Sequence, residues 1–142
     1  MVNKIVKGDI SKSFVVAKLL KEGYTVLEPT SENSRYDLVI DLNGKFVRAQ
    51  VKTIYYKNDK KVYEMVCYSV TRRNKKHIRA QYTEKEIDVI IGYNQDNDEV
   101  YTFPIKDING RNQIIFRDKR QANQHNPLDI SKYKDFIHLT KH

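Results

Sequence analysis

The spacing of hydrophobic residues changes near the start of the chain. Over residues 9–22 the apolar positions recur at helical spacing, at Ile10, Phe14, Ala17 and Leu20. We expect Asp9 to cap this helix or to lie in its first turn, and Gly23 to end it. Beyond Gly23, short apolar runs separated by turn residues replace the helical period. The pattern therefore predicts an amino-terminal helix followed by a chain rich in strands.

A hairpin signal covers residues 33–52, which read as two strands joined at Asn43-Gly44. An Asn-Gly pair favours a two-residue type I′ turn, because both residues tolerate a positive φ. Such a turn fixes the register of the two strands by counting. The pairs that it predicts are Leu42 with Lys45, Asp41 with Phe46, Val39 with Arg48, and Asp37 with Gln50.

This hairpin gathers three chemical groups. Side chains alternate across a strand, so Gln50 and Lys52 share one face and Val51 points to the other. With Asp37 opposite Gln50, a carboxylate, a carboxamide and an ammonium group come together. These are the groups needed to hold Mg²⁺ beside a phosphodiester. A lone Asp at the start of a strand is more often a turn cap, but the predicted partners of Asp37 favour the metal-site interpretation.

Further strands are expected along the rest of the chain. A second hairpin turn is predicted around Asn58-Asp59, a helical turn with a capping box at residues 83–86, and a last short helix over residues 129–136, capped by Asp129. The remaining strands are predicted at residues 24–27, 62–70, 88–93, 99–104 and 114–116. Because no repeat or linker interrupts the pattern, we expect a single domain over residues 1–142.

The charge balance favours a polyanionic partner. Lys and Arg number 26 against 18 Asp and Glu, which gives a formal net charge of +8. We interpret the basic run after the strand at residues 62–70 as a loop that binds phosphates. Two alternatives are open: the run is an ordinary solvated loop, or the net charge serves solubility alone. The candidate phosphate-binding residues of this run and of the Asn58-Asp59 turn are Arg72, Arg73, Lys75, Lys76, Arg79, Lys57 and Lys60.

The single cysteine excludes an internal disulfide framework and suits a reducing compartment. Cys67 lies inside an apolar run, so we expect a buried and unreactive thiol. The sequence has no run of about 18 apolar residues, and a membrane span is therefore not expected. The amino terminus lacks the apolar core of a signal peptide. These features predict a cytoplasmic protein.

The helix, followed by YDLVID at residues 36–41 and VRAQVKT at residues 47–53, resembles the PD-(D/E)XK nucleases. The variant with glutamine in the acidic position, here Gln50, resembles the homing endonucleases of cyanobacterial group I introns. The resemblance continues through residues 79–105 and the region of Arg117. It implies an α/β, restriction-endonuclease-like core with a mixed β-sheet, an N-terminal helix and a β-rich C-terminal half.

The resemblance also implies a role for each residue of the hairpin. Asp37 would be the metal-binding acid, and Gln50 would supply the ligand that most relatives take from Glu. The backbone carbonyl of Val51 would complete the inner shell of Mg²⁺, for which Mn²⁺ can substitute. Lys52 would orient the attacking water and offset negative charge on the phosphate. Together these roles imply a hydrolase that acts on phosphodiester bonds.

Lys12 departs from the family pattern. The first helix of relatives usually carries a Glu that lines the metal site, in an opening of the type GDIGE, whereas residues 8–12 read GDISK. Three interpretations are open: Lys12 lies in the site and inactivates it, by nature or by engineering; Asp9 or Glu32 replaces the missing carboxylate; or Lys12 points away and grips DNA. The first is favoured, with Lys12 counted among the catalytic-site residues and cleavage impaired.

The favoured function is that of a sequence-specific, Mg²⁺-dependent endonuclease that cuts double-stranded DNA in intron homing. A symmetric homo-oligomer, a dimer or a tetramer, is expected because one such site cuts one strand. A second hypothesis is a non-catalytic DNA-binding module on the same fold. A third is a structure-selective nuclease such as a junction resolvase. All three predict DNA binding that weakens as salt rises.

Overall fold

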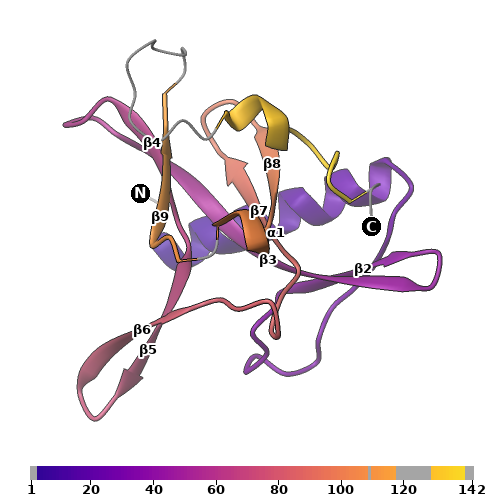
Figure 1. The fold of residues 1–142 in the computed structure, drawn as a ribbon, viewed down its shortest axis with the longest axis horizontal. Helices are drawn as coiled ribbons and strands as arrows, with labels where there is room; N and C mark the ends of the chain where they lie inside the picture. The colour runs from indigo at the N-terminus through magenta and orange to yellow at the C-terminus, as the bar shows by residue number, and fades with distance from the viewer. Residues whose placement is uncertain (1–2, 109, 118–128, 140–142) are drawn as a thin grey trace.

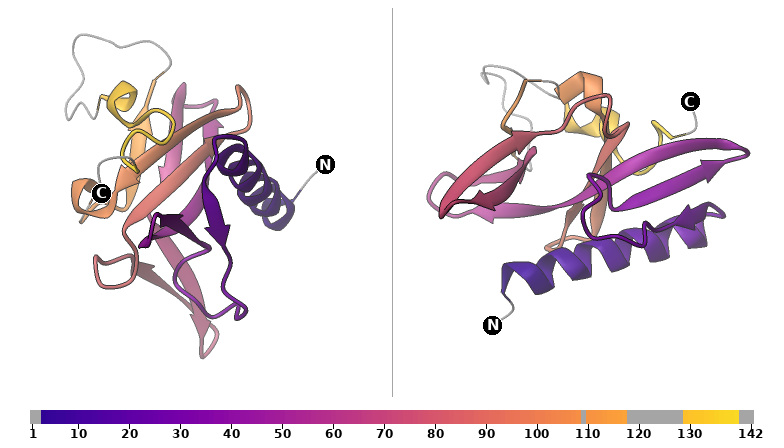
Figure 2. Two further views of the ribbon diagram at one scale, coloured as in Figure 1. Left: turned by 90° about the vertical axis from the view of Figure 1, so that its right-hand side faces the viewer. Right: turned by 90° about the horizontal axis from the view of Figure 1, so that it is seen from below.

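The computed structural model describes residues 3–108, 110–117 and 129–139, with a long helix packed along one face of a β-sheet (Figures 1 and 2). This helix, α1, covers Lys4–Lys21 and begins earlier than predicted. Asn3 caps it, with its Oδ1 accepting the Val6 N–H at 3.0 Å, so Asp9 lies inside the helix. Ile5 and Val6 are exposed, and the first turn therefore has no buried stripe that periodicity could reveal.

Gly23 ends the helix, as the sequence predicts. Its φ of 91° is the left-handed conformation that glycine adopts without strain. The Gly23 N–H donates to the Leu20 carbonyl and the Tyr24 N–H to the Leu19 carbonyl, both at 3.0 Å. This pair of bonds is a Schellman motif, which satisfies carbonyl groups at the helix end. The chain then turns directly into the first strand.

Nine strands and two short helical segments follow in the described part of the chain: β1 (Thr25–Leu27), β2 (Leu38–Leu42), β3 (Lys45–Lys57), β4 (Val62–Val66), β5 (Tyr68–Arg73), β6 (Lys76–Gln81), β7 (Val89–Asn94), β8 (Glu99–Pro104), α2 (Ile105–Ile108), β9 (Gln113–Phe116) and the 3₁₀ helix η1 (Ile130–Tyr133). Seven strands form one mixed sheet, and β5 pairs with β6 in a separate two-stranded sheet. The predicted mixed sheet, amino-terminal helix and β-rich carboxy-terminal half are confirmed.

β3 is the central strand of the large sheet. It pairs antiparallel with β2 at its start, parallel with β7 through its middle and antiparallel with β4 at its end. Asn43 and Gly44 have φ values of 55° and 95°, as the predicted turn requires. The predicted pairs Leu42–Lys45, Asp41–Phe46 and Val39–Arg48 are all confirmed.

Two clusters of buried side chains follow from alternation along β3. Val47, Ala49 and Val51 pack with Val15 and Leu19 of α1 in the first cluster. Gln50, Lys52 and Ile54 point to the opposite face, where Ile54 joins a second apolar cluster built from β4, β7, β8 and β9. The face that carries Gln50 and Lys52 is therefore the face that α1 does not cover.

The strand predicted over residues 62–70 is wrong as a single element. It divides at Cys67 into β4, which pairs with β9 in the large sheet, and β5, which pairs with β6. The Cys67 N–H donates to the Asn112 carbonyl at 2.9 Å, a contact across 45 residues that local patterning does not encode. Cys67 itself is buried, and burial raises its pKa to about 11, in agreement with an unreactive thiol.

The basic run that follows is also different from the prediction. It forms the β5–β6 hairpin rather than a loop, and it turns at Asn74 and Lys75, whose φ values are 49° and 63°. This hairpin protrudes from the body of the molecule at the lower left of Figure 1. Two successive positive φ values define a type I′ turn, which Asn favours and Lys does not. The turn was missed because its second residue is a lysine.

The other local predictions are largely confirmed. The Asn58-Asp59 region joins β3 and β4, and the Thr83 N–H donates to Glu86 Oε1 at 3.1 Å as in a capping box. Asp129 accepts the Ser131 N–H at 3.2 Å, but the element that it caps is one turn of 3₁₀ helix. Among the residues described, no helix is both long enough and apolar enough to cross a bilayer.

Candidate active site

Asp37 sits at the point where β2 begins and is bonded to β3 on both sides of Gln50. Its N–H donates to the Ala49 carbonyl at 2.9 Å, and its Oδ2 accepts the Val51 N–H at 3.0 Å. The regular ladder of β2 and β3 ends one pair earlier, at Leu38 and Ala49. The predicted pair Asp37–Gln50 is therefore outside the regular ladder, but the bonds of Asp37 to Ala49 and Val51 lie on either side of Gln50.

Lys52 lies on the same face as Gln50, two residues along β3. Its Nζ donates to the Tyr68 carbonyl at 2.9 Å and lies 5.4 Å from the centroid of the Tyr82 ring. Burial lowers the pKa of Lys52, and the charge of Asp37 opposes that shift. The ammonium group is therefore partly desolvated and held at the root of the β5–β6 hairpin.

Burial is also the largest influence on Asp37, whose pKa it raises. The hydrogen bond from the Val51 N–H and the charges of Lys12 and Lys52 act in the opposite direction, while Glu28 adds to the rise. A carboxylate in this setting is costly to ionise without a cation beside it. Lys12 and Lys52 therefore offset only part of the cost of ionising this carboxylate.

The positive charge of Lys12, on α1, acts on this carboxylate and favours its ionised form. Its Nζ lies 3.8 Å from Glu28 Oε2, and the two side chains are 35% and 54% exposed. Asp9, Lys12 and Glu28 line one surface hollow of about 470 Å³, while Glu32 is exposed in the loop after β1. The carboxylate that pairs with Lys12 is therefore that of Glu28. The sequence analysis named Asp9 and Glu32 as candidates and missed Glu28.

The oxygen atoms around Asp37 match the donors that Mg²⁺ prefers. In an extended strand the N–H and C=O of one residue point to the same edge, so the Val51 carbonyl leaves β3 on the side of Asp37. Gln50, the preceding residue of β3, carries a side-chain oxygen. No group of three or more His, Cys, Asp or Glu suited to a metal occurs in the described residues. The donor set fits a hard cation but contains fewer carboxylates than a typical cage.

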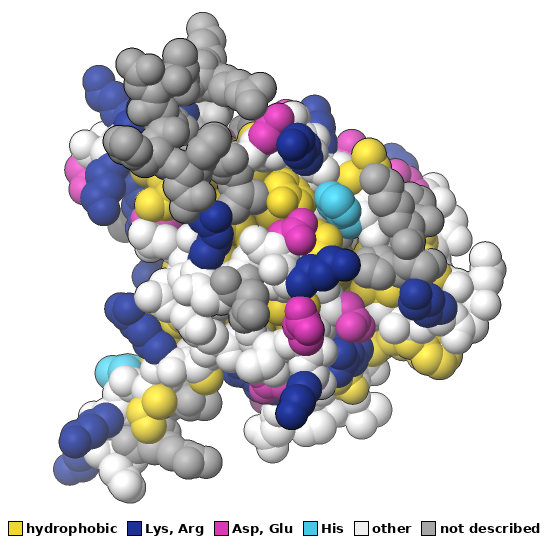
Figure 3. Space-filling view, viewed as in Figure 1, with side chains coloured by type: hydrophobic (Ala, Val, Ile, Leu, Met, Phe, Trp, Pro, Cys, Tyr) yellow, Lys and Arg dark blue, Asp and Glu magenta, His cyan; other side chains and the backbone are white. Residues whose placement is uncertain are grey.

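The predicted phosphate-binding residues lie on two hairpins. Lys57 and Lys60 are exposed at the β3–β4 turn. Lys75, Lys76 and Arg79 are exposed on the β5–β6 hairpin, where Lys and Arg side chains gather at the lower left of Figure 3. The side chains of Arg72 and Arg73 fall outside the described part of the structure.

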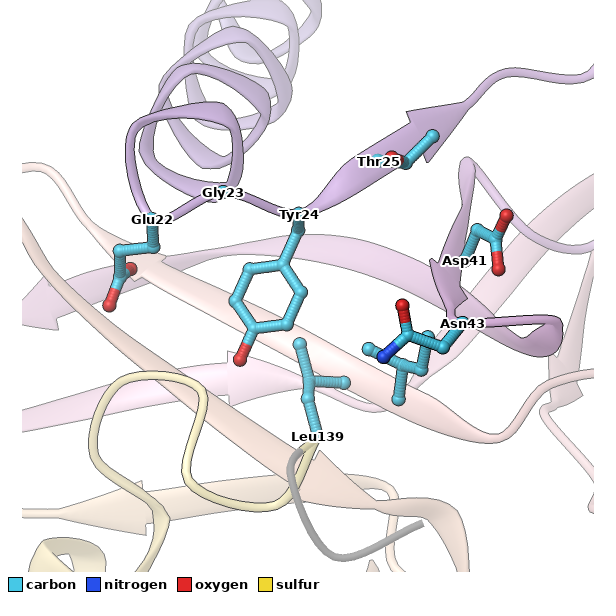
Figure 4. A pocket seen from close by; sticks show the side chains of 8 residues that line it. Glu22, Gly23, Tyr24, Thr25, Asp41, Asn43 and Leu139 are labelled. Atoms are coloured by element: carbon cyan, nitrogen blue, oxygen red, sulfur yellow. The ribbon is translucent and has the colours of Figure 1, made fainter.

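A second hollow lies at the other end of α1 and is separate from this site. It has a volume of about 500 Å³ and lies beside the Asn43-Gly44 turn (Figure 4). Its residues are Glu22, Gly23, Tyr24, Thr25, Asp41, Leu42, Asn43 and Leu139. The Asp41 carboxylate accepts the Gly44 N–H at 2.7 Å, so this acid stabilises the turn.

Sequence reasoning also missed Arg35, whose guanidinium lies two residues before Asp37 in the chain. It pairs with Glu86 at 2.7 Å and stacks on the Tyr82 ring, 4.3 Å from its centroid. Arg35 precedes the YDLVID segment, and nothing in its local sequence indicates these partners. They come from segments more than 40 residues away.

Comparisons with known proteins found similarity in sequence and in fold. The family model described as PD-(D/E)XK endonuclease matches residues 2–138. A solved structure of a bacterial homing endonuclease, I-Ssp6803I, superposes with a TM-score of 0.82 at 23% identity, over 98% of this chain and 93% of that one. Protein 5.3 of Escherichia phage T7 is 46% identical over 46 residues, which cover 32% of this chain and 39% of that protein.

The family model and the solved structure each match nearly the whole chain, and therefore the fold described above. The solved homing endonuclease shares the fold, and the family match includes α1, the β2–β3 hairpin and Asp37, Gln50 and Lys52. The phage protein adds a shorter stretch of similarity, so less than half of its own length is represented. Because the family match extends over almost the entire sequence, the chain belongs to the PD-(D/E)XK endonuclease family.

Proposed function

We propose that this protein is a sequence-specific, Mg²⁺-dependent endonuclease that cuts double-stranded DNA, of the intron-homing type. The observation that carries the proposal is the position of Asp37, whose backbone and carboxylate bond to β3 on either side of Gln50, with Lys52 on the same face. Homing activity is named for the solved structure of similar fold, and it is extended here to this chain.

Asp37, Gln50 and the Val51 carbonyl would hold the metal ion, with Mn²⁺ as a substitute. The ion would supply Lewis-acid stabilisation and a more acidic bound water. Lys52 supplies a positive charge from the protein beside the metal position, and its Nζ donates to the Tyr68 carbonyl. It would orient the attacking water and balance the negative charge that develops on the phosphate. A fixed charge of this kind needs little reorganisation during the reaction.

Lys12 would lower the activity of this sequence. It lies where its charge acts on Asp37, and it competes with a divalent cation for the same carboxylate. Repulsion between an ammonium group and Mg²⁺ at a partly solvated site is on the order of 1 kcal/mol or more. We therefore propose metal binding weaker than that of relatives with Glu at this position, and slower cleavage.

The exposed lysines and arginines of the β3–β4 turn and the β5–β6 hairpin would hold the DNA backbone. One site of this design cuts one strand. A double-strand break therefore requires two copies, and we propose a symmetric homo-oligomer, a dimer or a tetramer.

Lys12 also favours a second candidate function, a DNA-binding module without cleavage. In that case the ammonium group takes the place of the metal ion and contacts a phosphate. The two functions differ in their response to Lys12→Glu, which restores a carboxylate beside Asp37. The endonuclease gains metal-dependent cutting in this variant, whereas the binding module loses DNA affinity and does not cut.

The test uses long linear duplex DNA and a four-way junction, each incubated with Mg²⁺ or Mn²⁺. The proposal predicts cleavage of the duplex at discrete positions by the natural chain, and faster cleavage by Lys12→Glu. Selective cutting of the junction would instead identify a structure-selective nuclease such as a resolvase. Binding without cutting by both proteins would identify the DNA-binding module.

A further inference from the structure

Within the described residues, the β5–β6 hairpin pairs with no strand of the large sheet. It forms a two-stranded sheet of its own, joined to the body through Cys67 and Tyr82 at its two ends. An isolated two-stranded hairpin is only marginally stable in water. Its direction relative to Asp37 and Lys52 must therefore be fixed by side-chain contacts at its root.

Arg35 makes three hydrogen bonds to the hairpin. Its Nη1 donates to the Ser69 hydroxyl on β5. Its Nη2 donates to the carbonyls of Ala80 at 3.3 Å and Gln81 at 3.1 Å, both on β6. Its Nε donates to Glu86 Oε2 at 2.7 Å. One guanidinium thus joins both strands of the hairpin to the turn before β7.

The same root reaches the site through Tyr82 and Lys52. The Tyr82 ring is buried and lies next to both cations, 4.3 Å from the Arg35 guanidinium and 5.4 Å from the Lys52 ammonium. Lys52 Nζ donates to the carbonyl of Tyr68, the first residue of β5. A shift of the hairpin would therefore move the acceptor that holds Lys52.

We propose that Arg35 is a positioning residue that fastens the β5–β6 hairpin to Lys52, so that a duplex held on the hairpin is presented to Asp37. The inference rests on the proposed function for its consequence in cleavage. It goes further because it assigns the alignment of the DNA-binding hairpin and the reacting centre to one residue that itself contacts neither DNA nor metal.

The geometry separates this role from simple phosphate binding. All three guanidinium nitrogens of Arg35 are used within the protein, and the side chain is only 28% exposed. The planar fork is what reaches four acceptors on three segments, and a lysine ammonium cannot reproduce it. Arg35→Lys keeps the charge and loses the fork, so it distinguishes the two roles.

The first test needs no DNA and no metal ion. Amide hydrogen exchange is followed over residues 68–81, together with the rate at which Lys52 is methylated by formaldehyde and a borohydride. We expect both rates to rise about tenfold in Arg35→Gln and equally in Arg35→Lys. Arg48→Gln is the matched control, because Arg48 also bonds a carboxylate and two carbonyls, those of Asp88, Glu84 and Lys85, but no residue of the hairpin.

The second test measures single-turnover cleavage of long duplex DNA by the natural chain or, if it cuts too slowly, by Lys12→Glu. Arg35→Gln should lower the rate at saturating DNA by about tenfold or more, with less than a threefold change in the half-saturating DNA concentration. A positional defect lowers the saturated rate, whereas a lost phosphate contact raises the half-saturating concentration.

Unchanged exchange and methylation in Arg35→Gln, or recovery of both in Arg35→Lys, overturns the positioning role. If no protein cuts DNA but both rates rise as expected, the proposed function fails while the fastening of the hairpin to Lys52 stands. If Arg48→Gln raises both rates as much as Arg35→Gln, the effect is general loosening and the inference is overturned.

Discussion

The Asp37 carboxylate accepts the backbone N–H of Val51 at 3.0 Å, one residue before Lys52. This bond crosses from the start of β2 to the middle of β3 and fixes the acid against the strand that carries Gln50. The same residue also donates its own N–H to the Ala49 carbonyl, so the backbone and the carboxylate of Asp37 both bond to β3. The central groups of the site are thus held by two adjacent strands, which position side chains more firmly than loops do.

Asp37→Asn should abolish metal binding and leave DNA binding nearly intact. The amide oxygen still accepts the Val51 N–H, but the charge that attracts the cation is lost. Titration calorimetry with Mn²⁺ should give no measurable heat of binding for this variant. Affinity for duplex DNA in EDTA should stay within about threefold, or increase slightly, because a negative charge is removed.

Asp41→Asn is the matched control, with the same chemical change four residues further along the chain. Asp41 accepts the Gly44 N–H and lies outside the site, so its substitution should leave Mn²⁺ binding unchanged. Equal loss of Mn²⁺ binding in both variants is the outcome that contradicts the assignment of Asp37.

Lys12→Gln should strengthen Mn²⁺ binding. Removing a repulsion on the order of 1 kcal/mol corresponds to an affinity about fivefold higher. Glu28→Gln should act in the opposite direction, because Glu28 is the carboxylate that faces Lys12 at 3.8 Å. Neither change should alter the unfolding free energy by more than about 1 kcal/mol, as the pair is partly exposed. Lys4→Gln on the same helix is the control; an identical gain from it would remove any special role for Lys12.

The ion pair between Arg35 and Glu86 should make stability depend on pH. Burial opposes ionisation of Glu86, but hydrogen bonds from Arg35 and Thr83 outweigh it and hold its pKa below the ordinary value of 4.5. The folded state therefore binds fewer protons than the unfolded state. The contribution of Glu86 is fully present above pH 4.5 and is lost as the pH falls through the lowered pKa.

Urea unfolding between pH 7 and pH 3 measures this contribution of Glu86 to stability. The unfolding free energy of the natural protein should exceed that of Glu86→Gln at neutral pH, and the two should converge in acid. A difference between the two proteins that is constant across the range would show that ionisation of Glu86 does not contribute.

Gly92 tests the packing of β7 against β3 and β4. A Cβ at this position would lie 2.7 Å from the Met65 sulfur and 3.0 Å from Ile54 Cδ1. Gly92→Ala should therefore lower the unfolding free energy by about 1–3 kcal/mol. Gly8→Ala places the same methyl group on α1 with nothing within 4 Å and should raise stability by up to about 1 kcal/mol. Chemical denaturation of both variants measures these changes. A Gly92→Ala protein as stable as the unsubstituted protein would contradict the packing described.

The salt dependence of DNA binding tests the two basic hairpins. Each phosphate contact contributes about 0.9 to the slope of log affinity against log salt concentration. Lys76→Gln and Arg79→Gln should each reduce the magnitude of that slope by about this amount. Lys106→Gln in α2 lies outside both basic segments and should not change it. Slopes that are equal in all three variants would place the DNA on another surface.

The hairpin that carries the candidate site was predictable because it is local. Asn43-Gly44 determines the turn, and counting outward from it places Asp37 beside Gln50 without tertiary information. The face of Gln50 and Lys52 followed from strand alternation. Chemistry that depends on neighbouring strands joined by a short turn can be read from the sequence.

The remaining features depend on contacts between distant segments. Glu28 approaches Lys12 only because β1 pairs with β2 and α1 packs beside them. The division at Cys67 depends on Asn112, and the partners of Arg35 lie 34 to 51 residues further along the chain. No local pattern encodes such pairings, because the residue types and spacing within one segment do not indicate which distant segment will pack against it.

Metal-dependent cutting at Asp37 is tested by cleavage of long duplex DNA in Mg²⁺ by Lys12→Glu, with and without Asp37→Asn. We expect discrete double-strand cuts by Lys12→Glu that disappear in EDTA, and a rate at least about 100-fold lower in the double variant. Cleavage that persists without the Asp37 carboxylate, or an absence of cleavage in both Lys12→Glu and the natural chain, would contradict it.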